Sequence, residues 1–269
     1  MSWGGDLRAA VGFLTPMGGP APAPTPGAMA WFPVVGAAMG SAVGWCWAVA
    51  DGLWPGPVAA AVVVGTDLAL TGALHLDGLA DTADGLLAHA TARDRLAIMA
   101  EPQIGAFAAA GVCLALLNRW AALAAQEPSV ALMAAAYCSS RSLMVLGSRL
   151  LPYARPGGLV AAFLPPAGVP AQAGVPAQAG VPDQAAGVDR ALVAALIGMT
   201  GAFVVSWRAT GRRGAMAAVA GWAAGGAVLL GARRRLGGFT GDVLGAAGVA
   251  AETAWLLVAA GRSPRRGRQ

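Results

Sequence analysis

Residues 104–125 read IGAFAAAGVCLALLNRWAALAA, an almost unbroken run of apolar and small side chains. A helix that crosses a bilayer needs ~20 such residues, so this stretch has the length and composition of a membrane span. The apolar character is continuous rather than alternating, which disfavours transmembrane strands. Comparable runs recur at 31–50, 53–76, 129–150, 190–207, 214–231 and 241–260. The sequence therefore predicts an all-α, polytopic integral membrane bundle with six or seven transmembrane helices.

The composition supports the same fold class. Charged residues make up 12% of the chain, hydrophobic residues 57%, and the mean hydropathy is +0.62. Soluble domains carry roughly 25% charged residues, so this chain lacks the charge to cover a surface exposed to water. The net charge of +5 comes from arginines at the ends of the apolar runs, not from one basic patch. We therefore expect lipid as a partner and no nucleic acid.

Residues 1–269 are interpreted as a single membrane-embedded domain, interrupted by a low-complexity loop at about 165–188. The loop contains the near-repeat GVPAQAGVPAQAGVPDQAAGV at 168–188, whose short copies cannot bury a core.

The arginines also predict an orientation. Three Arg-bearing connections are separated by pairs of spans and so share one face: 77–103, 150–189 and 232–240. An excess of Arg is typical of the cytoplasmic side, so we predict a multi-pass protein of the cytoplasmic (inner) cell membrane whose site faces the cytoplasm. In a seven-span count, Arg208, Arg212 and Arg213 fall on the opposite face, and so does the basic tail after Gly261. The sequence leaves this conflict open.

The most informative segment for function is LHLDGLADTADGL, residues 74–86. Asp77, Asp81 and Asp84 stand at i, i+4 and i+7, which at ~100° per residue places the three carboxylates on one helix face. No Lys or Arg lies within four residues of any of them. A divalent cation relieves their mutual repulsion, and carboxylate ligands suit Mg²⁺ or Mn²⁺. We predict a Mg²⁺ site here; the alternative is a solvated amphipathic face. Beside the motif, His75 is a candidate for ligand orientation or proton transfer, with a structural hydrogen bond as the alternative.

A second acidic element is GGFTGDVLGAAGVAAE, residues 237–252. Asp242 opens the last apolar run, and the glycines around it allow the backbone to approach a ligand closely. Four candidate spans separate the first motif from Asp242, and an even number returns both to the same membrane face. The two acidic elements can therefore meet, which makes Asp242 a candidate functional residue beside the three aspartates. Gly238, Thr240 and Gly241 are predicted to contact phosphate.

Two arginines are candidate phosphate ligands, because a guanidinium group matches phosphate in a bidentate manner. Arg141 lies inside the run 129–150, and Arg155 follows it in PYARPGG, residues 152–158. The alternative for Arg155 is snorkelling to the membrane interface. The alternative for Arg141 is pairing with a structural acid.

Carboxylates, a hard divalent ion and arginines at a membrane face indicate chemistry on a phosphate ester or diphosphate. An aspartate could deprotonate the attacking hydroxyl. Three classes of protein remain open on residue chemistry alone: a phosphotransferase, an Asp-rich intramembrane prenyltransferase, and a cation transporter. No Walker-type loop is present, which disfavours ATP hydrolysis.

Several stretches carry a family resemblance along nearly the whole chain. They are WFPVVGAAMG at 31–40, TGALHLDGLADTADGL at 71–86, RLAIMAEPQIGAF at 95–107, SRSLMVLGSRLLPYARPGGL at 140–159 and GGFTGDVLGAAGVAAE at 237–252. In this order, among several spans, they resemble the cobalamin synthase family of adenosylcobinamide-GDP ribazoletransferases. The chain departs from the family pattern at Pro16, Ala100 and Gln103, where relatives commonly carry basic residues.

The resemblance implies a Mg²⁺-dependent membrane transferase with one catalytic domain. Its substrates would be adenosylcobinamide-GDP and α-ribazole, or α-ribazole 5′-phosphate, and GMP would be released. It also implies that the four aspartates hold metal and diphosphate, that one of them acts as base, and that Arg141 and Arg155 contact phosphate. The sequence is compatible with a homo-oligomer.

Overall fold

The computed structural model describes residues 3–18, 25–155, 159–163 and 189–261. Within these ranges the chain is helical and contains no named strand, which confirms the predicted all-α class. The predicted low-complexity loop at 165–188 lies outside the described residues. The helices are α1 (Trp3–Leu14), α2 (Phe32–Leu53), α3 (Gly56–Thr71), α4 (Leu74–Leu87), α5 (Ala92–Ile98), α6 (Ala106–Ala124), α7 (Val130–Leu150), α8 (Arg190–Thr210), α9 (Arg212–Leu236) and α10 (Gly241–Ala260), with short 3-10 turns at Pro16–Gly18, Pro26–Trp31 and Leu159–Phe163.

Six helices in the described ranges are long and apolar enough to cross a membrane: α2 with its preceding turn, α6, α7, α8, α9 and α10. The bent pair α3 and α4 would make a seventh span, so the predicted six or seven is confirmed. Large apolar side chains such as Trp45, Leu114, Ile197 and Met216 are exposed on these helices. Lipid would cover such an exterior, since water disfavours large exposed apolar patches.

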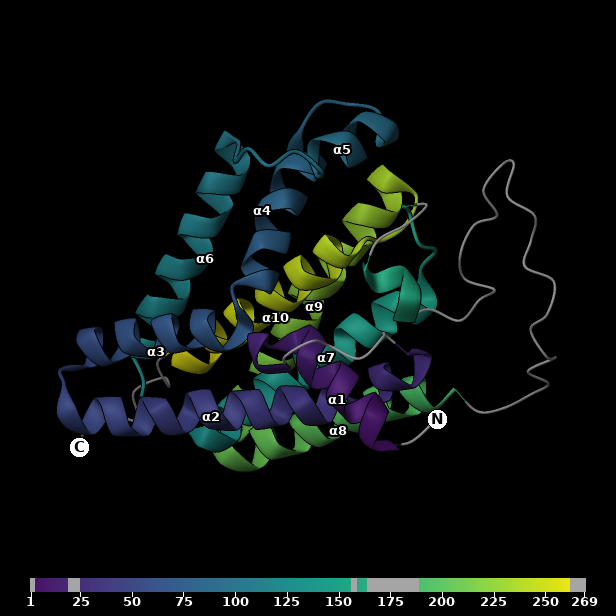
Figure 1. Cartoon of the computed structure of the whole chain (residues 1–269). Coiled ribbons are helices and arrows are strands. Elements are labelled where there is room, and N and C mark those ends of the chain that lie inside the picture. Colours follow the sequence, from purple (N-terminus) through teal and green to yellow (C-terminus); the bar gives the residue numbers. More distant parts are fainter. Residues whose placement is uncertain (1–2, 19–24, 156–158, 164–188, 262–269) are drawn as a thin grey trace.

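The predicted span 53–76 is wrong at its C-terminal end. Helix α3 ends at Thr71, α4 begins at Leu74, and their axes differ by 89°. Gly72 and Ala73 between them have φ values of 58° and 57°, in the left-handed region that ends a helix. Figure 1 shows α4 rising nearly at a right angle from α3. The aspartate motif therefore lies on a separate helix that turns away from the span before it.

The interior of the bundle is formed mainly by α7 and α10, whose residues are the most enclosed among the candidate spans. Helix α2 lies along α7 through Gly36, Gly40 and Gly44. A Cβ atom at Gly36 would stand 2.6 Å from the carbonyl oxygen of Tyr137, and one at Gly44 would stand 2.7 Å from the Cα atom of Val130. Small residues spaced four apart let helix backbones meet closely, which is how helices associate in lipid.

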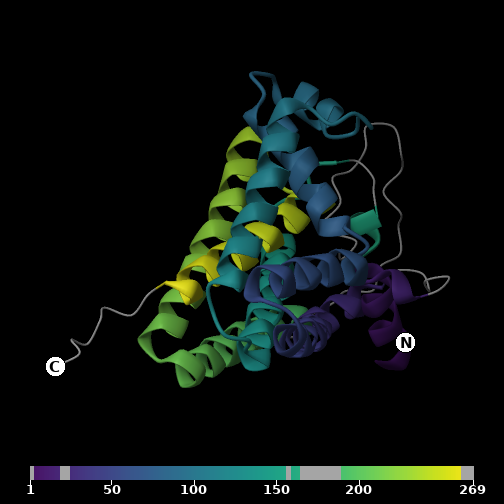
Figure 2. The same cartoon turned by 90° about the vertical axis from the view of Figure 1, so that its left-hand side faces the viewer.

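The helix that carries the aspartates packs against the end of the chain. Helix α4 contacts both α6 and α10. Figure 2 shows α4 standing beside α6, with α10 crossing behind them. Residues near 80 and residues near 245 are therefore neighbours, although most of the chain separates them in sequence.

Candidate active site

The predicted meeting of the aspartate motif with Asp242 is confirmed. It depends on Gly78, which stands one residue after Asp77 on α4. A Cβ atom at Gly78 would lie only 2.8 Å from the carbonyl oxygen of Asp242 and 3.0 Å from its Cα atom. The two backbones therefore touch at this point, with α6, α7, α8 and α9 between them in sequence. These four helices are candidate membrane spans, whereas the short α5 (Ala92–Ile98) is not, and an even number of spans brings both acidic elements to the same end of the bundle.

A short pairing of extended backbone fixes the segment after α7 against the segment before α10. Tyr153 and Phe239 form an isolated parallel bridge. The Phe239 N–H donates to the Pro152 carbonyl at 2.9 Å, and the Ala154 N–H donates to the Phe239 carbonyl at 2.8 Å. The neighbouring Gly238 packs directly against the Pro152 carbonyl, where a side chain would clash. Sequence patterns gave no sign of this pairing, because it joins two irregular segments far apart in the chain.

This backbone pairing places Arg155 next to Asp242. An Nη1 atom of Arg155 lies 3.0 Å from Oδ2 of Asp242, and both side chains are about one quarter exposed. A second Arg155 nitrogen, Nη2, donates to the Met99 carbonyl at 3.2 Å. Burial raises the pKa of the nearby Tyr153 hydroxyl, against the opposing effect of Arg155. The guanidinium group is thus held at the site on two sides while remaining partly open to solvent.

Two residues predicted to contact phosphate have a structural role in the backbone around Asp242, and their contact with phosphate stays a prediction. The side chain of Thr240 is fully buried and caps α10 by accepting from the Val243 N–H at 3.3 Å. Gly238 is required by the close approach of Pro152. Gly241, in contrast, lines a cavity next to Asp242.

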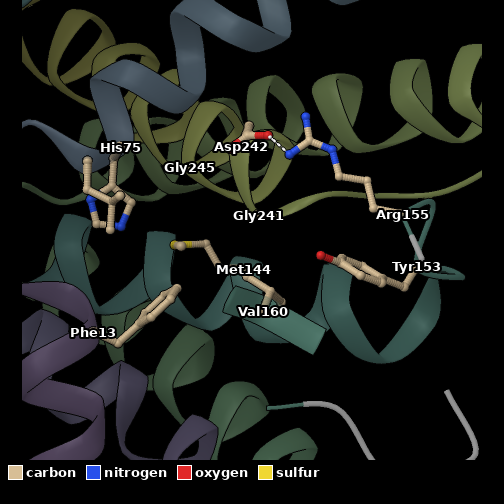
Figure 3. A pocket seen from close by; sticks show the side chains of 10 residues that line it. Phe13, His75, Met144, Tyr153, Arg155, Val160, Gly241, Asp242 and Gly245 are labelled. Carbon is tan, nitrogen blue, oxygen red and sulfur yellow. Dashed lines mark ion pairs between the residues drawn. The ribbon is translucent and has the colours of Figure 1, made fainter. Parts of the chain in front are cut away.

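This cavity has a volume of about 240 Å³ and lies between α1, α4, α7 and α10. Arg155 and Asp242 form a charged part of its wall, and His75 stands at another part (Figure 3). Apolar side chains make up much of the remainder. The lining residues are Phe13, Leu74, His75, Met144, Tyr153, Arg155, Val160, Gly241, Asp242 and Gly245.

His75 is 5% exposed, and neither ring nitrogen has a hydrogen-bond partner among the residues that the structure describes. Buried polar atoms in proteins are nearly always paired, so an unpaired imidazole at a cavity wall indicates a missing partner. The prediction that His75 belongs to the site agrees with this position.

The three aspartates of α4 divide into two environments. Asp84 accepts from the Gly105 N–H at 2.6 Å and from the Ala108 N–H at 2.9 Å, and so binds the first turn of α6. Asp77 is exposed and Asp81 is partly exposed. In the described part of the chain, neither of these two carboxylates makes a hydrogen bond or an ion pair. Asp77 and Asp81 are therefore the carboxylates still available to a ligand.

The predicted cage of four carboxylates is not assembled in the structure. Across the described ranges, no three Asp, Glu, His or Cys side chains come close enough together to hold a metal ion as they stand. Two of the four aspartates have other partners, since Asp84 binds α6 and Asp242 pairs with Arg155. Asp81 nevertheless lies within electrostatic range of Asp77 and Asp242.

Arg141 has the arrangement that was the alternative to phosphate contact, pairing with an acidic residue. Arg141 is fully buried and pairs with Glu252 of α10, while donating to the Ser140 hydroxyl at 2.7 Å. Arg119 of α6 joins the same cluster, 3.1 Å from Glu252 and 2.9 Å from Asp67 of α3. Two positive and two negative charges thus balance inside the bundle, as burial in a membrane requires. Arg119 and Asp67 were not singled out from the sequence, although each is a lone charge within an apolar run.

Comparison with known proteins gives a consistent family. The model of the Cobalamin-5-phosphate synthase family matches residues 6–260. A protein of Bradyrhizobium diazoefficiens named adenosylcobinamide-GDP ribazoletransferase is 34% identical, over 95% of this chain and 93% of that protein. Proteins of the same name from Ralstonia nicotianae and Chlorobaculum tepidum are 35% and 34% identical, each over 85% of this chain and over 83% and 84% of their own lengths.

No solved structure matches the chain. The family match nevertheless runs from within α1 to the end of α10 and includes both segments that meet at Gly78 and Asp242. The chain belongs to the Cobalamin-5-phosphate synthase family.

Proposed function

We propose that this chain is an adenosylcobinamide-GDP ribazoletransferase, a membrane enzyme that joins adenosylcobinamide-GDP to α-ribazole or α-ribazole 5′-phosphate and releases GMP. Relatives with this name match the chain over 93% and 83% of their own lengths. The structural observation that carries the proposal is the contact of Gly78 with Asp242, which unites the aspartate helix with the Asp242–Arg155 pair beside a cavity.

The proposed reaction is a substitution at phosphorus. A ribose hydroxyl of the ribazole forms a new O–P bond to the phosphate linked to cobinamide. The bond from that phosphorus to the bridging oxygen of the diphosphate breaks, and GMP leaves with the bond's electron pair. The hydroxyl proton passes to an aspartate carboxylate, for which Asp81 is the candidate, since its carboxylate makes no hydrogen bond in the described part of the chain.

Two features of the site suit the diphosphate of the substrate. Arg155 offers a planar guanidinium group that is partly open to solvent. Residues Gly241 and Asp242 form the first turn of the 20-residue helix α10, whose N-terminus favours a bound anion. Together they provide one fixed positive charge and one helix terminus for the phosphate groups.

The proposal includes Mg²⁺. In proteins this ion is usually bound by one or two carboxylates together with water and substrate phosphates, not by a closed protein cage. Asp77 and Asp81 fit that requirement, because both lie on one face of α4 and neither carboxylate is engaged by another described residue. When bound, the ion would neutralise charge on the phosphate oxygens. Asp242 would complete the acidic side of the site after Arg155 turns to phosphate.

We further propose that the site faces the cytoplasm at the inner membrane. Arg95 donates to the Gly85 carbonyl at 2.9 Å, and Arg235 donates to the Leu86 carbonyl. Both arginines therefore lie at the C-terminal end of α4, the end that carries Asp84. An excess of Arg at one end of a bundle is typical of the cytoplasmic side, which supports this orientation.

The test uses purified protein in lipid nanodiscs with adenosylcobinamide-GDP, α-ribazole and Mg²⁺, and measures GMP and the corrinoid product. Asp81→Asn should lower the rate at least ~100-fold, as expected for loss of a general base or metal ligand. The matched control is Asp51→Asn at the exposed C-terminal end of α2, which should leave the rate unchanged.

Absence of GMP with the unmodified protein would refute the proposed reaction. Release of inorganic diphosphate from a polyprenyl diphosphate would instead indicate a prenyltransferase. Turnover by Asp81→Asn equal to that of the control would remove Asp81 from the chemistry.

A further inference from the structure

The two ends of the cavity differ in chemistry. Near Arg155 and Asp242 the wall is charged, with the two side chains 3.0 Å apart. Near His75 the wall is formed by Phe13, Leu74 and Met144, which are apolar. In Figure 3 the side chains of Phe13 and Met144 lie on the His75 side of the view, and Arg155 lies on the opposite side. A ligand that fills the cavity must therefore be charged at one end and apolar at the other.

The size of the cavity limits what it can hold. Its volume of about 240 Å³ is below the ~300–1,000 Å³ of pockets that enclose a whole drug-sized ligand. A corrin ring is far larger than such a ligand. The cavity therefore fits one part of a substrate, and a small planar ring system is the part that an apolar wall next to a phosphate site suits.

The wall near His75 is preorganised by aromatic packing. The ring of Phe13 stacks on Phe32 with centroids 5.6 Å apart and meets the edge of Phe163 at 4.8 Å. Both neighbouring rings are fully buried. Phe13 is thus held in place before any ligand arrives, which lowers the entropic cost of binding a flat ring against it.

His75 adds one specific polar group to this apolar end. A neutral imidazole has one N–H donor and one acceptor nitrogen, and neither ring nitrogen of His75 is paired among the described residues. On its other side, His75 borders a space of about 10 Å³ shared with Arg119, Arg141 and Glu252. That space is close to the volume needed for a single water, so one ring nitrogen can be satisfied there and the other by a ligand in the cavity.

We propose that the end of the cavity lined by Phe13, Leu74 and Met144 binds the aromatic base of the acceptor nucleoside, and that His75 donates a hydrogen bond to the in-plane acceptor nitrogen of that base. This inference rests on the proposed function. It makes His75 a binding residue for the nucleoside, not the base that removes the hydroxyl proton. The charged end then receives the phosphate at which the two substrates are joined.

The test pairs a change in the protein with a change in the ligand. α-Ribazole, the natural nucleoside, has a benzimidazole base. It is compared with the indole analogue of α-ribazole, in which the in-plane acceptor nitrogen is replaced by C–H. With the unmodified protein, the indole analogue should show a kcat/KM lower by ~10-fold, the usual effect of one buried hydrogen bond. His75→Phe should lower kcat/KM for the natural nucleoside by a similar factor. The same variant should leave kcat/KM for the indole analogue as it is with the unmodified protein. KM for adenosylcobinamide-GDP should not change in either case.

Two control variants separate the hydrogen bond from packing. His89→Phe changes the other histidine of the chain, which is exposed, and should keep the full preference for the benzimidazole nucleoside. Phe13→Leu removes the flat wall and should raise KM severalfold for both nucleosides equally.

Several outcomes would overturn the inference. If the unmodified protein uses both nucleosides equally well, no hydrogen bond to the ring nitrogen exists, and this result does not depend on any variant folding. If His75→Phe lowers kcat equally for both nucleosides, His75 acts on the hydroxyl or on the structure. Failure of the proposed function is distinguishable, because the unmodified protein would then form no GMP with either nucleoside. In that event, calorimetric binding of free benzimidazole and free indole still tests the subsite, which predicts tighter binding of benzimidazole.

Discussion

Replacing Glu252 by Gln should destabilise the protein strongly, although Glu252 does not line the cavity beside Asp242. The Glu252 carboxylate accepts from Arg119 at 3.1 Å, from the Ser140 hydroxyl at 2.7 Å, and from Arg141. Glutamine keeps the volume of the side chain but removes its charge and turns an N–H donor toward an arginine. The buried cluster would then hold two positive charges and one negative charge, so one positive charge would be uncompensated.

The expected loss of stability depends on which arginine is left without a charged partner. Removal of one partner from a buried ion pair costs ~3–5 kcal/mol. Arg119 keeps Asp67 at 2.9 Å, so it retains a charged partner. Among the described residues, Arg141 keeps Ser140 and the ring of Tyr137 as its remaining partners, the ring centroid being 4.9 Å from the guanidinium carbon. One stranded charge places the loss near the lower end, ~3 kcal/mol, which is a large share of an ordinary stability of ~5–15 kcal/mol.

The assay is thermal unfolding of detergent-purified protein, followed by the fraction that remains monodisperse on size-exclusion chromatography. For a chain of this size, ~3 kcal/mol corresponds to a fall in the transition temperature of ~10 °C. The matched control is Glu127→Gln, an exposed position that should change stability by less than ~0.5 kcal/mol. Adding Arg141→Met to Glu252→Gln should restore part of the loss by removing the stranded charge. If Glu252→Gln matched the Glu127 control, or if the double variant were less stable than the single one, the charge argument would be refuted.

The remaining predictions concern the aspartate helix and its partners. Gly78→Ala should lower kcat by ~100-fold, because its Cβ atom would lie 2.8 Å from the Asp242 carbonyl and force the two elements apart. The control is Gly65→Ala, whose Cβ atom would meet no other atom within 4 Å and which should leave the rate of GMP release unchanged. Arg155→Lys keeps the charge but loses the bidentate fork, so kcat/KM for adenosylcobinamide-GDP should fall ~10-fold, and an unchanged value would exclude phosphate contact. Ala73→Gly should raise thermal stability by ~1 kcal/mol, because Ala73 has a φ of 57° that costs a non-glycine residue energy; lower stability would show that the strain is absent.

The number of spans and the meeting of the two acidic motifs could be predicted, because both follow from the number of apolar runs in the sequence. The number of apolar runs gave the number of spans, since each run of ~20 residues has only one way to satisfy its backbone in lipid. The even number of spans between the motif at Asp77 and the one at Asp242 predicted that both lie on one face. Helical spacing predicted the common stripe of Asp77, Asp81 and Asp84, which α4 contains.

The roles of individual side chains could not be predicted in the same way. Asp84 looks identical to Asp81 in the sequence, and only the position of the first turn of α6 makes it a helix cap. Arg155 reaches Asp242 through backbone pairing between irregular segments, which leaves no periodic signal. The break before α4 depends on a left-handed conformation at Ala73, a residue type that rarely adopts it.

The contact between Gly78 and Asp242 also has a consequence for biosynthesis. Asp242 belongs to the last helix of the chain, and about 160 residues must follow Gly78 out of the ribosome before the two can touch. A nascent protein that has inserted only its earlier helices therefore has the aspartates of α4 but not yet Asp242. Turnover can begin only once the final segment has entered the bilayer, so incompletely synthesised chains should neither consume the corrinoid nucleotide nor release guanylate.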